Sequence, residues 1–140
     1  MIGIIGLYIL GSVTSPMVGD VWSVNNTHTI TWDSVPTVHI QLEMYNNAWE
    51  TSINNINFLS TVADDFSYDW NIPIYLSQYW HYPKRIRLTD VEMIDNWYSG
   101  VFNTTGLSID TLSLTENELR LSWRTNIDNS RFNIFLYDNE

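Results

Sequence analysis

The sequence predicts an all-β protein, built as a sandwich of antiparallel sheets. Apolar and polar residues alternate with a period of two along several segments. This is the pattern of strands that face a core on one side and water on the other. Turn-forming residues separate the segments about every 8–12 residues. No long stretch places apolar residues at helical spacing. Together these observations favour a β-sandwich.

Four segments show this alternation. In Thr27–Trp32 the threonines lie on one face, while His28, Ile30 and Trp32 lie on the other. Three further runs have apolar faces made of Val38, Ile40, Leu42 and Met44, then Phe66, Tyr68, Trp70 and Ile72, and then Ile86 and Leu88. Residues 33–36, 46–47, 54–57 and 63–65 separate the runs. Asn and Asp end strands there because they tolerate left-handed backbone conformations.

Length, net charge and the absence of Cys exclude several kinds of protein and site. A chain of 140 residues has room for one compact domain. Its 7 Trp, 8 Tyr and 5 Phe can fill a core. A formal charge of −10 argues against binding nucleic acid or anionic lipid, since both attract Lys and Arg. The absence of Cys removes disulfides, thiolate metal sites and cysteine nucleophiles.

The amino terminus allows two interpretations. Residues 2–10 are apolar apart from two glycines and Tyr8, and Gly11 and Ser12 follow. Nine residues cannot span a bilayer as a helix, which needs about 20. Residues 1–12 therefore form either a short secretion signal, cleaved near Gly11, or a first β-strand.

A weak internal repeat divides the rest of the chain. Ile30-Thr31-Trp32 is echoed by Leu121-Ser122-Trp123, and the alternation after each copy is also similar. We therefore place a sandwich at residues 13–109. Residues 110–140 resemble the opening hairpin of a second repeat, with strands between Leu119 and Tyr137. The apolar face of such a hairpin must dock on the sandwich, on a partner chain or on further residues. Chance similarity of two amphipathic hairpins is the alternative.

Catalytic and metal-binding patterns are weak. His28, His39 and His81 have no acidic partner at a diagnostic spacing, and no serine lies in a nucleophile motif. The acidic residues at positions 64, 65, 90, 92 and 95 do not fit the EF-hand pattern and are expected to be solvated loop residues. We expect no enzyme, no cofactor and no metal.

The run Tyr79, Trp80, His81 and Tyr82 is a candidate binding site. Exposed rings stack on sugars or anchor a partner chain. The alternative is that these rings cap the open end of the core. Two sequons make Asn25 and Asn103 possible glycan acceptors if the chain passes through a eukaryotic secretory route.

Several short motifs resemble one family in the same order. They are Ser15-Pro16, Gly19, Trp22, Val24 and Ile30-Thr31-Trp32; Ile40-Gln41-Leu42; Tyr68-Asp69-Trp70-Asn71-Ile72-Pro73; Arg85-Ile86-Arg87-Leu88-Thr89-Asp90; and Tyr98-Ser99-Gly100-Val101-Phe102. Residues 13–102 thereby resemble the amino-terminal domain of yeast cell-wall glucan-assembly proteins. This domain also occurs in Ser/Thr-rich GPI-anchored fungal surface proteins and in microbial surface repeats.

The resemblance implies an immunoglobulin-like, or fibronectin-III-like, antiparallel β-sandwich, here with an additional carboxy-terminal β-hairpin. Its motifs are architectural: Gly19 permits a turn with positive φ, Trp22, Trp32 and Trp70 fill the core, and Pro73 ends a strand. The expected function is that of a non-catalytic module of a cell-surface, cell-wall or envelope protein. It would act outside the cell through protein or polysaccharide contacts, with no nucleic acid and no transmembrane helix. The alternative is a structural subunit of a virion shell or filament, whose hairpin pairs with a neighbouring copy.

Overall fold

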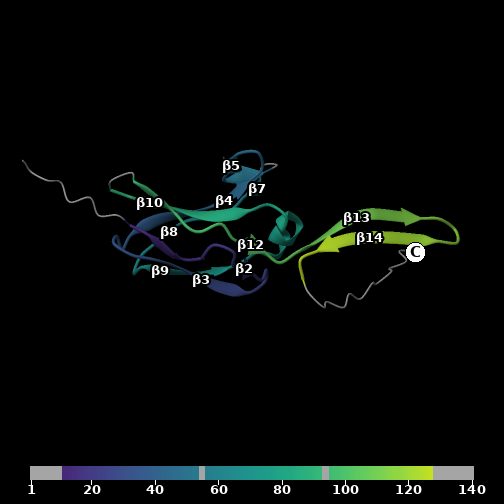
Figure 1. The fold of residues 1–140 in the computed structure, drawn as a ribbon, viewed down its shortest axis with the longest axis horizontal. Helices are drawn as coiled ribbons and strands as arrows, with labels where there is room; N and C mark the ends of the chain where they lie inside the picture. Colours follow the sequence, from purple (N-terminus) through teal and green to yellow (C-terminus); the bar gives the residue numbers. More distant parts are fainter. Residues whose placement is uncertain (1–10, 54–55, 93–94, 128–140) are drawn as a thin grey trace, which may run out of the picture.

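The computed structural model describes residues 11–53, 56–92 and 95–127 (Figure 1). It is an all-β protein in which two antiparallel sheets enclose one apolar core, which confirms the predicted fold class. Residues 1–10 of the possible signal segment 1–12, and the downstream half of the predicted hairpin, 128–140, lie outside the described residues. No helix among the described residues is long and apolar enough to cross a membrane.

The smaller main sheet has three strands in the order β1-β3-β9. They span Val13–Ser15, Thr27–Trp32 and Ser67–Asn71. Ile30 of β3 lies opposite Tyr68 of β9. Along β3 the threonines point outward, while Ile30 and Trp32 are buried, as the alternation predicts.

The larger main sheet is built around β4 (Val38–Tyr45). On one side β4 pairs with β10 (Lys84–Asp90), which pairs with β11 (Asn96–Tyr98). On the other side β4 pairs with β5 (Trp49–Glu50) and β8 (Ser60–Ala63). Val38, Ile40, Leu42 and Met44 face the core, together with Ile86 and Leu88.

Short elements complete the fold. Two of them, β2 (Val21–Trp22) and β12 (Asn103–Thr104), pair in parallel, and β6 (Ser52–Ile53) pairs with β7 (Ile56–Asn57). A 3₁₀-helix, η1 (Ile74–Tyr79), follows Pro73 after the end of β9. Its six residues are too few to show a helical period in the sequence.

The predicted turn chemistry is largely confirmed. Gly19 adopts φ 85°, and Asn47 and Asp65 adopt φ 63° and 60°, which glycine, asparagine and aspartate tolerate better than other residues. The expectation that Phe66 lies on an apolar strand face is wrong, because it is 42% exposed. Its own φ of 61° keeps it in the turn, so β9 begins only at Ser67.

The chain then leaves the sandwich as a two-stranded hairpin. It consists of β13 (Leu107–Leu114) and β14 (Leu119–Thr125), which pair antiparallel. Figure 1 shows this hairpin extending beyond the η1 end of the sandwich, along the long axis of the molecule. We call residues 107–125 the arm. The partner of β14 among the described residues is β13; the predicted partner segment, residues 132–136, lies outside them.

Candidate interaction surfaces

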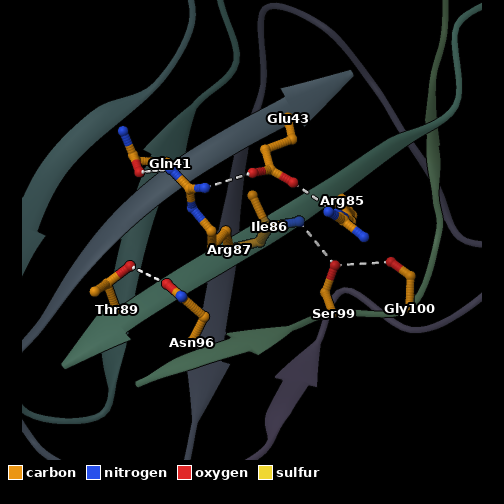
Figure 2. A network of polar contacts seen from close by, with 9 residues as sticks. All are labelled: Gln41, Glu43, Arg85, Ile86, Arg87, Thr89, Asn96, Ser99 and Gly100. Carbon is orange, nitrogen blue, oxygen red and sulfur yellow. Dashed lines mark hydrogen bonds and ion pairs between the residues drawn. The ribbon is translucent and has the colours of Figure 1, made fainter. Parts of the chain in front are cut away.

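Charged side chains occupy the outer face of the larger sheet (Figure 2). They are placed there because outward positions on β4 and β10 lie opposite each other, with Glu43 facing Arg85 and Gln41 facing Arg87. Glu43 Oε2 accepts a hydrogen bond from Arg85 Nε at 2.6 Å, and its Oε1 lies 3.0 Å from Arg87 Nη1. The Glu43 side chain is only 4% exposed, because the two arginines cover it.

Aromatic rings enclose one of these arginines. The Arg85 guanidinium lies 4.2 Å from the ring centroid of Trp49 and 4.0 Å from that of Tyr98. Both distances are within the range of a cation–π contact. Arg87 donates from Nη2 to Gln41. We call Glu43, Arg85, Arg87, Trp49 and Tyr98 the arginine–aromatic face.

This face has the chemistry of a protein interface. Two arginines and one glutamate give it a local charge of +1 on a chain of −10. Arg, Tyr and Trp are the residue types enriched at the energetic centres of protein contacts. The sequence does not reveal this site, because its residues come from four strands and meet only once the register is known. The available signal was the pair Arg85 and Arg87 at outward positions of one strand.

The predicted aromatic site lies at the end of η1 and in the turn that leads into β10, three residues before Arg85. Tyr79 is 8% exposed and belongs to the core, where its ring centroid lies 6.3 Å from that of Phe58. Tyr82 packs partly against the same core, Trp80 is half-buried, and His81 is exposed. These positions fit rings that cap the core more closely than a set of rings exposed together. A binding role for the four residues stays a prediction.

Lys84 fixes the backbone of residues 79–82, which we call the aromatic turn. Its Nζ donates to the Tyr79 and Tyr82 carbonyl oxygens, at 2.8 and 2.9 Å. The side chain is fully buried, and this burial lowers the pKa of Lys84 from 10.5 to about 7. Burial also lowers the pKa of His81, with smaller contributions from Arg124 and Lys84.

The lowered pKa predicts a pH-dependent stability. Between pH about 7 and about 10.5 the unfolded chain holds a proton on Lys84 that the folded chain releases, so folding stability rises with pH in that window. Below pH 7 both states are protonated and the cost of burial is fully present. Relative to Lys84→Met, we expect the wild type to gain up to about 1.4 kcal/mol per pH unit from pH 7 to 9. Urea unfolding across that range measures this difference; equal slopes for both proteins would contradict it.

The arm is fixed at its root. Asn126 accepts a hydrogen bond from Gly106 N at 2.8 Å and donates to the Thr104 carbonyl at 2.9 Å. Thr125 donates its hydroxyl to the Gly106 carbonyl at 2.6 Å. Gly106 itself lies against η1, where a Cβ would overlap the Ser77 carbonyl oxygen and Trp80. The direction of the arm is therefore set by the sandwich.

One face of the arm is apolar. Leu112 lies opposite Leu121, and Leu114 lies opposite Leu119. Opposite residues share a face, and so do residues two apart, so these four leucines line one side. Leu112 is 68% exposed and Leu114 is 76% exposed. A long apolar strand face that is open to water is a feature of interaction sites.

The other sequence candidates have structural partners. His28 stacks on Trp22 with ring centroids 4.8 Å apart, and His39 lies 3.1 Å from the Ser60 hydroxyl. No three His, Asp or Glu side chains among the described residues gather as a metal site. The expectation that Asp90 is a solvated loop residue is wrong, because it is buried at the end of β10 and accepts a hydrogen bond from Glu92 N. Of the two sequons, Asn25 is exposed in a turn, and Asn103 is half-buried in β12. Glycosylation of either one stays a prediction.

Comparisons with known proteins add no identification: no family model, curated protein or solved structure matches this chain.

Proposed function

We propose that this chain is a non-catalytic β-sandwich module of a cell-surface, cell-wall or envelope structure, working outside the cell or in a virion. Its fold would be of the immunoglobulin-like kind, and its contacts would be with other proteins. Of the two expected functions, the one best supported is that of a structural subunit whose hairpin contacts a neighbouring copy. The arm is the observation that carries this proposal.

An isolated two-stranded hairpin such as the arm has poor stability of its own. Two strands alone are marginal in water, and a third strand or a packed face is needed for stability. Among the described residues, the contacts that fix the arm lie at its root, while Leu112 and Leu114 near its end are exposed. Covering such side chains stabilises a contact by about 1.5–3 kcal/mol each when burial is complete. A partner at the arm would supply that cover.

Polysaccharide contact is less well supported. It would use rings that lie side by side on the surface. Tyr79 is in the core and Tyr82 is packed against it, so the aromatic turn presents fewer rings than its sequence suggests. We therefore place protein contact ahead of sugar contact.

We expect the chain to self-associate through the arm, and two substitutions in the arm to abolish this association. The wild type should exceed the mass of one chain at high concentration in light scattering or sedimentation equilibrium. Leu112→Glu with Leu114→Glu should stay monomeric, because charged side chains oppose burial of the arm. The matched control is Met17→Glu with Val18→Glu, which changes two exposed apolar residues on the sandwich, at 64% and 79% exposure, and should associate like the wild type. A wild type that is monomeric throughout would refute the proposal.

A further inference from the structure

We infer that the arm of one copy docks on the arginine–aromatic face of a second copy. This inference rests on the proposed function, and it names the surface that receives the arm. It follows from the charge of the two surfaces, their exposed apolar side chains, their lengths and the fixed direction of the arm.

The arm and the arginine–aromatic face carry opposite charges. The sandwich has three described cations, Lys84, Arg85 and Arg87, and Lys84 is fully buried. The arginine–aromatic face is therefore the cationic surface of the described sandwich, whose loops are rich in Asp and Glu. The turn at the end of the arm carries Glu116 and Glu118. An acidic turn and a cationic face of the same chain are complementary.

Unused bonding capacity on both surfaces is consistent with this pairing. Arg85 uses Nε for Glu43, and its terminal nitrogens bond no residue of the described chain. Glu118 pairs with Arg120 at 3.0 Å on the surface of the arm, a contact of little strength because both side chains are exposed. Glu116 has no bonding partner among the described residues. It is the carboxylate we assign to Arg85 of the second copy.

The apolar side chains also match. At the end of β13, just before the acidic turn, the arm exposes Leu112 and Leu114. The outer face of the larger sheet presents Tyr45 and Tyr98, at 44% and 45% exposure, with Val62 on β8 at 59%. Leucines against tyrosine rings would exclude water around the ion pairs and so strengthen them.

Length and direction make the contact intermolecular. Both β13 and β4 have eight residues, and a strand of that length spans about 26 Å at about 3.3 Å per residue. The arm can therefore lie along the whole of a neighbouring sheet. Because its root is fixed and it extends away from its own sandwich, its end does not reach its own sheet (Figure 1). Two copies can exchange arms in a closed dimer, or each can pass its arm to the next copy in a chain.

A mixing experiment tests the receiving surface. The arm-deficient chain is Leu112→Glu with Leu114→Glu, and the face-deficient chain is Tyr45→Glu with Tyr98→Glu. Each alone should be monomeric. Mixed in equal amounts, they should form a one-to-one dimer, because one intact arm meets one intact face. If the double variant fails to fold, Tyr45→Glu alone replaces it, because Tyr45 is not one of the two rings that contact Arg85. This single variant should weaken association at least tenfold.

Charge reversal provides an independent measurement. Glu116→Lys with Glu118→Lys should weaken association by tenfold or more, and added salt should weaken the wild type in the same direction. The control, Glu92→Lys with Asp95→Lys, makes the same change of net charge in the exposed β10–β11 loop and should leave association intact.

The outcomes separate the two proposals. A monomeric wild type would refute both. If the wild type associates through the arm but the face-deficient chain associates equally well, or if the mixture of deficient chains stays monomeric, the arginine–aromatic face is not the receiver. In that case the arm docks elsewhere, for example on a second arm, and the proposed function stands without this inference.

Discussion

Replacing Glu43 by glutamine is expected to lower the free energy of unfolding by about 3 kcal/mol. Removing one partner of a buried ion pair leaves the other charge buried and uncompensated, at a cost of about 3–5 kcal/mol. Here one carboxylate serves two arginines, whose side chains remain 22% and 29% exposed, so water offsets part of the loss. We therefore expect the lower end of that range.

Urea unfolding of the wild type and Glu43→Gln measures this cost. Glu92→Gln is the matched control, because Glu92 is exposed in the β10–β11 loop and should change stability by about 0.5 kcal/mol or less. Equal, small effects for both variants would mean that the two arginines are solvated well enough to need no counter-charge.

The sequence could predict strands and inward faces but not the burial of Glu43. Period-two alternation correctly placed Ile40 and Leu42 inside and Glu43 outside. A residue on the outer face of a sheet is normally exposed to solvent. Glu43 is nevertheless covered by side chains from the neighbouring strand, and only 3% of it is exposed. That cover depends on which residues lie opposite one another, and register is a property of the folded sheet.

The same limit applies to the candidate surfaces. Trp49 and Tyr98 meet around Arg85 although 49 positions separate them, so no local motif could reveal the contact. By contrast, the run from Tyr79 to Tyr82 is conspicuous in the sequence, and its rings lie largely against the core. The aromatic run is easy to find because its residues are neighbours along the chain. The residues around Arg85, which have the chemistry of an interface, are neighbours only in the folded structure.

The largest cost from the core is expected at Trp22. Trp22→Ala should lower the free energy of unfolding by about 3–5 kcal/mol, the range for removing a large aromatic side chain from a core. Trp22 is 7% exposed, and its ring centroid lies 4.8 Å from that of His28 and 5.1 Å from that of Phe102. The substitution removes partners from β3 and from the chain that leads into β12.

Trp22 also connects the core to the arm. Its carbonyl accepts a hydrogen bond from Thr105 N at 2.9 Å, one residue before Gly106. Trp22→Ala keeps this carbonyl but removes the packing of the indole on His28 and Phe102, which holds the Trp22 backbone in place. The substitution should therefore loosen the root of the arm as well as the core. Hydrogen exchange at Thr105 and Gly106 should rise in Trp22→Ala by more than in Phe66→Ala, whose exposed ring should cost about 1 kcal/mol or less. The contrary result would be an equal loss of stability in both variants, with the same hydrogen exchange at Thr105 and Gly106. The arm would then be held by its own hydrogen bonds, and packing around Trp22 would contribute nothing to its direction.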